Sequence, residues 1–210
     1  MPVNVKDREY REIRVTNLEI REEQDGKKIV EGYATTFDQE YHLFGDERYQ
    51  VLESVDRHAF DSADMSDVIM QYDHEGRVFA RLSNGTLQLA ADDHGLKMKA
   101  DLGGTEIGRQ LYEEIRGGYT TKMSFGFSVK KSERKVEVNE ENGNTTVHRK
   151  IMEIKKLYDV SAVSLPANDA TEISARNIGE GVVAEIEQER LAIEARTRKE
   201  NQIAILAKSF

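Results

Sequence analysis

The chain has 210 residues, and its 30 lysine and arginine residues against 39 aspartate and glutamate residues give a formal net charge of -9. An acidic chain neutralises little phosphate, which disfavours a nucleic-acid-binding role, and no run of about 18 apolar residues that would span a membrane is present. The absence of cysteine excludes disulfides, thiolate metal sites and a cysteine nucleophile, and it fits a reducing compartment such as the cytoplasm.

Short segments in which apolar and polar residues alternate recur along the chain and predict β-strands. The first is expected over 11–21 and the second over 28–37, with a turn at Gly26 between them. Five more are expected over 49–54, 68–72, 78–82, 86–91 and 96–102. The sequences Asn84-Gly85 and Asp93-His94-Gly95 are typical of hairpin turns between such strands.

Two helices are expected among these strands. A short one covers 57–63, and a clearer one covers 105–116. In the second, Thr105 is a suitable N-cap, Ile107, Leu111 and Ile115 recur on one face, and Gly117-Gly118 supplies the stop.

Strands resume over 122–131, 151–154 and 157–165, where Pro166 ends the last one, while the polar segment 133–147 is interpreted as an exposed hairpin or loop. About nine short strands and one good helix favour a mainly β domain with some α structure. We expect a closed or nearly closed β-barrel flanked by helices. From Gly179 the chain becomes rich in alanine, glutamate and arginine, which predicts a β-barrel domain over 1–178 and a helical C-terminal tail over 179–210.

Motifs for nucleotide phosphates and for zinc proteases are absent from the sequence. Among the five histidines, His42, His58, His94 and His148 lie in turns, at a helix start or beside the polar segment, and we interpret them as solvated residues. His74 differs because it closes the apolar strand 68–72 between two acidic residues. A strand end is a rigid support, and neutral imidazole accepts a proton near pH 7, so His74 is either a general base or a solvated turn residue.

Ser124 opens a strand in which Met123, Phe125 and Phe127 should share one face and Ser124 and Gly126 the other. Gly126 would leave room for a substrate backbone to approach, although small residues packed under a helix give the same pattern. Asp159 lies in an otherwise apolar strand, where a carboxylate needs a partner. A histidine is one such partner, and arginine, lysine or solvent are the alternatives.

The order of these segments resembles the tailed-phage prohead protease family, which comprises capsid-maturation serine proteases related in fold to herpesvirus assemblins. The likeness spans about 14–176 and rests on these segments: Glu31-Gly32-Tyr33-Ala34, Glu53 through Ala59-Phe60, the strand before His74, 96–102 with Thr105 and 107–118, Met123-Ser124-Phe125-Gly126-Phe127, and 157–168. In three places the chain departs from the family pattern. Asp73 and Glu75 flank His74, where asparagine before and aspartate after are commoner. Arg57-His58 stands where Pro-Gly is usual, and Asp159 stands where glutamate is frequent.

The resemblance implies a serine endopeptidase in which Ser124 is the nucleophile, His74 the base and Asp159 the group that orients the imidazole. It further implies cleavage of a capsid protein or scaffold protein during procapsid maturation, self-cleavage, and a location in the host cytoplasm inside the assembling procapsid. No cofactor, nucleic acid or membrane is expected, and formation of a homo-oligomer stays open. Backbone N–H groups near Gly126 or over 166–169 are the candidates for an oxyanion hole.

Two other functions remain open at this stage. The same fold could serve as a non-catalytic, scaffold-binding capsid assembly factor. Asp73, His74 and Glu75 could instead ligate the metal of a hydrolase, although successive residues of a strand point to opposite faces and make a poor ligand set.

Overall fold

The computed structural model describes residues 8–13, 18–139 and 141–163, together with 188, 191, 192, 195, 196 and 198. This part of the chain is mainly β, with one α-helix, and none of its helices is long and apolar enough to cross a membrane. The elements are β1 (Glu9–Ile13), β2 (Glu19–Glu22), β3 (Lys28–Thr36), β4 (Tyr41–Gly45), β5 (Tyr49–Val55), β6 (Ile69–Tyr72), β7 (Glu75–Arg81), the 3-10 helix η2 (Leu82–Asn84), β8 (Leu87–Ala91), β9 (Gly95–Asp101), α1 (Glu106–Arg116), β10 (Lys122–Val138) and β11 (Thr145–Val163).

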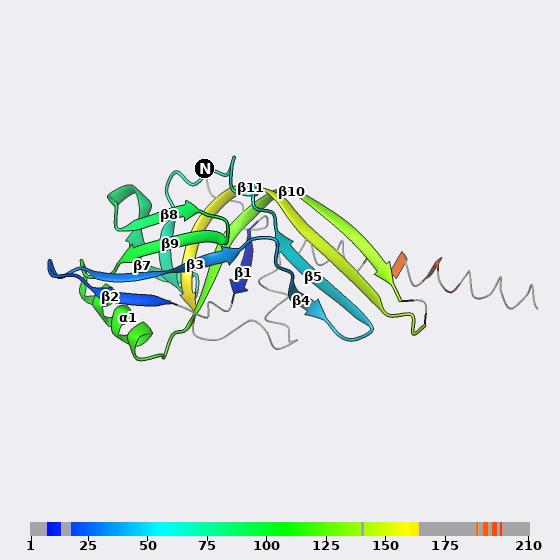
Figure 1. Cartoon of the computed structure of the whole chain (residues 1–210), viewed down its shortest axis with the longest axis horizontal. Coiled ribbons are helices and arrows are strands. Elements are labelled where there is room, and N and C mark those ends of the chain that lie inside the picture. The colour runs from blue at the N-terminus through cyan, green and yellow to red at the C-terminus, as the bar shows by residue number, and fades with distance from the viewer. Residues whose placement is uncertain are drawn as a thin grey trace, which may run out of the picture.

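The strands form two sheets (Figure 1). The larger has seven strands in the order β1-β10-β11-β5-β4, and β6 pairs with both β11 and β7 beside this path. The smaller has four strands in the order β2-β3-β9-β8. All neighbours are antiparallel except for β11, which runs parallel to β5 and to β6.

The two longest strands, β10 and β11, organise the larger sheet. β11 has 19 residues, so it pairs with β5 over 145–151 and separately with β6 over 159–162. The β10–β11 hairpin therefore reaches from the region beside the smaller sheet and α1 outward to its tip, where β4 and β5 accompany it (Figure 1). The inner half of this hairpin carries both Ser124 and Asp159.

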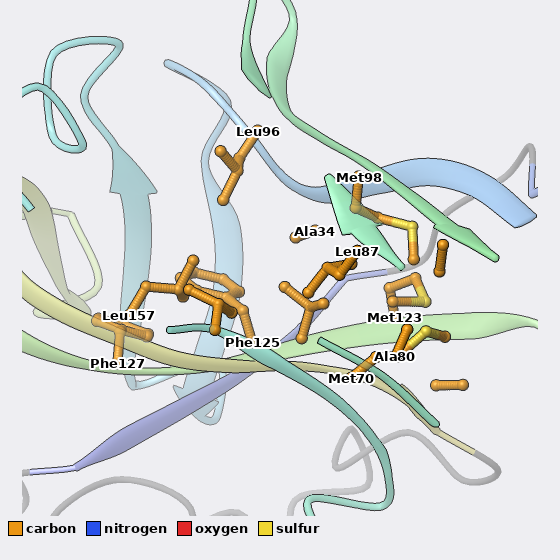
Figure 2. Packing of buried hydrophobic residues seen from close by; sticks show 14 of the residues in the cluster. Ala34, Met70, Ala80, Leu87, Leu96, Met98, Met123, Phe125, Phe127 and Leu157 are labelled. Carbon is orange, nitrogen blue, oxygen red and sulfur yellow. The ribbon is translucent and has the colours of Figure 1, made fainter. Parts of the chain in front are cut away.

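The main hydrophobic core lies between the two sheets (Figure 2). The larger sheet contributes Phe125, Phe127 and Leu157, and the smaller sheet contributes Leu87 and Met98, all essentially without exposed surface. Because alternate residues of a strand face opposite sides, burying Phe125 and Phe127 in this core turns the residues between them toward the other face.

The expected closed or nearly closed barrel is not supported, because the described strands pair into two separate sheets. The chain leaves the larger sheet after β7, passes through η2, and enters the smaller sheet at β8. Gly85 ends η2 with a φ of 76°, a left-handed conformation that glycine adopts without strain. Asn84-Gly85 thus redirects the chain between sheets rather than closing a hairpin, whereas Asp93-His94-Gly95 does join the antiparallel pair β8 and β9.

The other local predictions have mixed outcomes. Helix α1 is confirmed, with Thr105 Oγ1 accepting a hydrogen bond from the Gly108 N–H at 3.0 Å. The helix expected over 57–63 is wrong, since that segment consists of turns. The polar segment 133–147 mostly belongs to β10 and β11, and β4 was not expected at all. The predicted tail over 179–210 and its boundary at 178 fall almost wholly outside the described residues and stay predictions.

Candidate active site

The register between β10 and β11 brings two of the predicted residues onto one face of the larger sheet. Ser124 lies opposite Ser161, and Gly126 lies opposite Asp159. Residues paired across neighbouring strands share a face, so Ser124 and Asp159 are diagonal neighbours on the face turned away from Phe125. This is the alternation that the sequence predicts for the strand containing Ser124.

His74 reaches the same face from the hairpin between β6 and β7. Tyr72 pairs with Glu75, so Asp73 and His74 form a two-residue turn. Their φ values are 47° and 60°, as both central residues of a type I′ turn require. Aspartate and histidine are among the residues that tolerate this left-handed region, and β6 runs beside the end of β11 that carries Asp159. The histidine therefore sits in the turn after β6, two residues beyond the end of the predicted strand.

The three side chains form a continuous hydrogen-bonded line. His74 Nδ1 is 2.5 Å from Asp159 Oδ1, and His74 Nε2 is 2.5 Å from Ser124 Oγ. A carboxylate can only accept, so Nδ1 carries the proton and Nε2 is left to accept the hydroxyl proton of the serine. This arrangement is chemically able to activate an alcohol as a nucleophile.

The site is largely closed to solvent. Ser124 and Asp159 have no exposed surface, and 12% of the His74 side chain is exposed. Burial alone would raise the pKa of Asp159, but the hydrogen bond from His74, the positive charge that the imidazole carries when it is protonated, and the charge of Arg8 lower it. Ser161 Oγ also donates to Asp159 Oδ1 at 2.8 Å. The carboxylate therefore stays ionised at neutral pH, although a peptide can reach Ser124 Oγ only after neighbouring groups move aside.

Three residues at the site were not predicted from the sequence. Arg8 pairs with Asp159 Oδ2, the ring centroid of Tyr10 lies 4.3 Å from that of His74, and Ser161 binds Asp159. Ser161 could have been found, because it follows Asp159 by two residues and so shares its face. Arg8 and Tyr10 gave no local signal, since their partners lie far away in the chain.

Gly126 has a different role from the one expected. A Cβ atom at this position would lie 2.3 Å from Asp159 Oδ2, 2.9 Å from the Tyr10 ring and 3.1 Å from Arg8 Nε. The space beside the missing side chain is therefore already filled by the contact of Arg8 and Tyr10 with Asp159. The sequence suggested that this space would admit a substrate backbone, and that expectation is wrong.

Replacing Gly126 with alanine should consequently disturb Asp159. The carboxylate is short, buried and held by several partners, so the clash is expected to cost about 1–3 kcal/mol of folding free energy and to slow any reaction that depends on His74. Urea unfolding and cleavage rates measure both effects. Gly104→Ala is the matched control, because a Cβ there meets nothing within 4 Å and should change stability by less than about 0.5 kcal/mol.

A groove of about 590 Å³ opens beside the His74 turn, between α1 and the β6–β7 hairpin. Its walls combine apolar, acidic and other polar side chains, namely Tyr72, Phe79, Ile107, Leu111, Asp73, Glu75, Glu114, Gln110 and Arg77, together with Gly76. The groove is therefore large enough for side chains of a peptide and adjoins the residues on either side of His74.

The remaining candidates have other surroundings. His58 contacts Asp61 at 3.0 Å and His148 contacts Glu40 at 2.7 Å, whereas the His94 ring packs edge-on against Tyr33. Within the described ranges, no group of three or more histidine and acidic side chains, including that around His74, is arranged to hold a metal ion.

Of the two segments considered for an oxyanion hole, one lies in the described structure. Gly126 belongs to a strand that is paired with β1 on one side and β11 on the other, so its N–H is directed into the sheet. The other segment, 166–169, falls outside the described residues.

The family model for caudovirus prohead serine proteases matches residues 16–182. Among solved structures, that of the bacteriophage T4 capsid assembly protease gp21 is similar with a TM-score of 0.41 and 10% sequence identity, and the alignment covers 75% of this chain and 98% of that chain. No curated protein matches the sequence.

Proposed function

The chain belongs to the caudovirus prohead serine protease family, and we propose from this premise that it is a serine endopeptidase whose catalytic residues are Ser124, His74 and Asp159. The observation that carries the assignment is the unbroken line from the serine hydroxyl through the imidazole to a buried carboxylate, with 2.5 Å at each step. These groups come from β10, a turn and β11, which are segments far apart in the chain.

In the proposed reaction, Ser124 Oγ attacks the carbonyl carbon of the scissile peptide while His74 Nε2 takes its proton. The imidazolium then returns this proton to the leaving amine, which releases the first product and leaves an acyl-serine. Water, activated in turn by His74, hydrolyses this ester. Asp159 fixes the imidazole with Nδ1 protonated and stabilises its positive charge in both steps.

The covered position of Ser124 fits a protease that must stay inactive until its substrate is assembled around it. We propose that the arrangement described above is a resting form, in which the triad is already built but the approach to Oγ is closed. Segment 166–169 remains the candidate for the oxyanion donors, since the Gly126 N–H is directed into the sheet.

The proposed substrate is the capsid protein, or a separate scaffold protein, within the procapsid of the same phage. Self-cleavage is part of this proposal. The proposal also divides the chain into a protease domain over 1–178 and a tail over 179–210. The tail would dock the enzyme to the scaffold and then be cleaved off.

Co-expression with the major capsid protein of the same phage tests this function. The wild-type chain should shorten the capsid or scaffold protein and itself on a denaturing gel, and mass spectrometry should locate the cut sites. Ser124→Ala should leave both at full length while folding normally. Assembled but uncut capsids with the wild-type chain would instead favour the non-catalytic assembly factor.

We further propose that the groove beside the His74 turn receives substrate side chains. Gln110 is exposed on α1 and lines this groove, so Gln110→Trp should partly fill it without touching the triad. The expected result is about a tenfold higher KM for a peptide spanning a mapped cut site, with kcat changed far less. An unchanged KM would exclude the groove as a substrate subsite.

A further inference from the structure

Asp159 has partners on both carboxylate oxygens. Oδ1 accepts hydrogen bonds from His74 Nδ1 and Ser161 Oγ, and Oδ2 pairs with the guanidinium of Arg8. A fully buried carboxylate is costly unless its charge is balanced. While His74 is neutral it supplies only a hydrogen bond, so Arg8 is the cation that balances Asp159 in the resting enzyme.

The guanidinium of Arg8 is itself held in place. It lies over two aromatic rings, 5.1 Å from the centroid of Tyr10 and 4.7 Å from that of Tyr158. These cation–π contacts fix the plane and reach of the side chain, of which 20% is exposed. Gly126 provides the space in which Arg8, Tyr10 and Asp159 meet, because a Cβ atom there would overlap Asp159 Oδ2 and lie in tight contact with the Tyr10 ring and Arg8 Nε.

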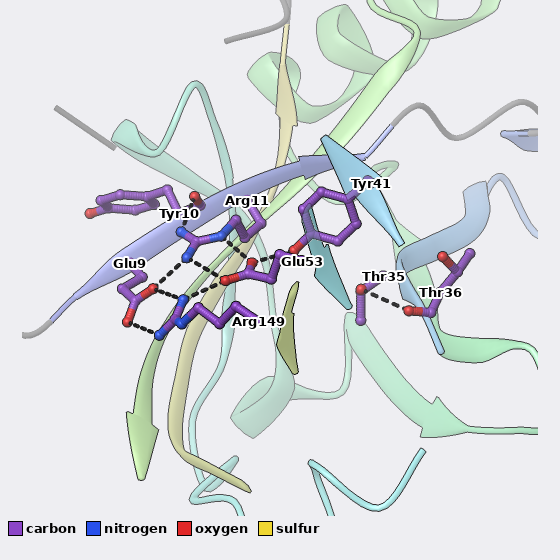
Figure 3. A network of polar contacts seen from close by, with 8 residues as sticks. All are labelled: Glu9, Tyr10, Arg11, Thr35, Thr36, Tyr41, Glu53 and Arg149. Carbon is purple, nitrogen blue, oxygen red and sulfur yellow. Dashed lines mark hydrogen bonds and ion pairs between the residues drawn. The ribbon is translucent and has the colours of Figure 1, made fainter. Parts of the chain in front are cut away.

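The strand that presents Arg8 is anchored from its other face. Among the described strands, β1 lies at one edge of the larger sheet and pairs with β10, with Tyr10 opposite Gly126. Tyr10 faces the site, whereas Glu9 and Arg11 point to the opposite side, where they join Glu53 and Arg149 in a buried charge network (Figure 3). One face of β1 therefore joins the buried charge network through Glu9 and Arg11, and the other presents Tyr10 to His74.

We propose that Arg8 is a positioning residue of the protease, which holds Asp159 by Oδ2 so that Oδ1 stays aligned with His74 Nδ1. This inference rests on the proposed function, and it adds a fourth residue, which directly precedes β1, to the line formed by Ser124, His74 and Asp159. Arg8 acts through Asp159 and has no contact with the reacting atoms.

The charge of Arg8 also has a consequence for the pH dependence of cleavage. The groups that face the imidazole are Tyr10 from β1, Ser124 from β10 and Asp159 from β11, while Asp73 and Glu75 flank it in the chain. The positive charge of Arg8 offsets part of the negative charge of Asp159. Without Arg8, Asp159 would stabilise a proton on the imidazole more strongly. The acid limb of the kcat/KM profile should therefore move to higher pH when Arg8 is neutralised.

The test compares Arg8→Met, Arg8→Lys and the wild-type chain on a peptide that spans a cut site mapped with the wild-type enzyme. Arg8→Met should lower kcat about tenfold or more, with KM changed less than about threefold, and should shift the acid limb upward. Arg8→Lys restores a cation and should recover part of kcat and return the acid limb toward its wild-type position. Arg21→Met is the matched control, since it removes an arginine that pairs with Glu31 on the smaller sheet, and its kcat should be unchanged.

Two results would overturn the positioning role. One is an Arg8→Met variant with wild-type kcat and pH profile. The other is an equal loss of kcat in Arg8→Met and Arg8→Lys, together with a lowered thermal midpoint and an unmoved acid limb. A residue with a purely structural role would give that pattern. A wild-type chain without peptidase activity would reject the proposed function itself, and with it this role.

Discussion

Replacing His74 with alanine is expected to slow peptide cleavage by about a million-fold, because Ser124 then has no base to take its proton. Ser124→Ala should have an effect of similar size. The two residues act as one unit through the 2.5 Å contact between His74 Nε2 and Ser124 Oγ. The variant that lacks both should therefore be no slower than either single variant, and cleavage rates of the three purified proteins measure this.

The same variants show whether Ser124 and His74 contribute to the cleavage rate as a pair or independently. If the effects of the two substitutions multiplied in the double variant, Ser124 and His74 would not be functioning as a pair. Asp159→Asn should lose somewhat less, about 10⁴-fold, because it disturbs the tautomer and orientation of the imidazole rather than removing it. Each variant should still unfold in one cooperative urea transition, which shows that the loss of cleavage is not a loss of the fold.

The second large effect concerns stability and involves Glu53. This carboxylate has no exposed surface and accepts from Arg11 Nη2 at 3.0 Å, from Arg149 and from Tyr41 Oη at 2.5 Å (Figure 3). Glu53→Ala would leave two buried guanidinium groups, which share Glu9 as their other carboxylate partner among the described residues. The expected loss is about 3–5 kcal/mol of unfolding free energy, measured by urea titration at pH 7. Glu153→Gln, which breaks an exposed pair with Lys130, is the control and should cost less than about 0.5 kcal/mol.

Glu53 should also make the fold sensitive to acid. Burial alone would raise its pKa, but Arg11 and Arg149 outweigh burial and lower the pKa to about 2. A carboxyl whose pKa is lower in the folded chain contributes stability above its unfolded pKa, about 4.3, and loses that contribution as the pH falls toward 2. The wild-type chain should thus lose about 3 kcal/mol between about pH 5 and pH 2, and Glu53→Gln should flatten this part of the curve. An equally steep acid loss in Glu53→Gln would place its origin elsewhere.

The buried network also affects the proposed active site, because it fixes β1, which carries Tyr10 and directly follows Arg8. Glu9 and Arg11 belong to β1, Glu53 to β5 and Arg149 to β11, so the network joins three strands of the larger sheet. Weakening it should loosen β1 and with it the support of Asp159. A partial loss of kcat in Glu53→Gln, measured at a pH where the variant is fully folded, is the expected sign of this coupling.

Several features were accessible from the sequence for identifiable physical reasons. The alternation around Ser124 predicted which side chains of β10 enter the core, since a strand has only two faces. Thr105 and the spacing of Ile107, Leu111 and Ile115 predicted α1, since N-caps and helical periodicity are local signals. An isolated carboxylate among apolar residues indicated that Asp159 has a partner. The resemblance to prohead proteases then linked Asp159 to His74.

Other features depend on contacts between distant segments, and the sequence held no local signal for them. Glu53 was part of the family resemblance, yet its buried partners Arg11 and Arg149 lie 42 and 96 residues away. Nothing near Arg8 indicates that it meets Asp159. The two-sheet arrangement escaped prediction for the same reason, because the count of strands does not say where their pairing is interrupted, and the short 3-10 helix after Arg81 interrupts it.

The central claim is that His74 activates Ser124 as the nucleophile, and covalent labelling tests it most directly. A preparation that is actively cleaving its substrate is treated with a fluorophosphonate, and the modified residue is located by peptide mass spectrometry. The account predicts that the adduct forms on Ser124, that cleavage stops as the adduct accumulates, and that labelling nearly disappears in His74→Ala. Inhibition with Ser124 unmodified, or equal labelling of Ser124 with and without His74, would contradict it.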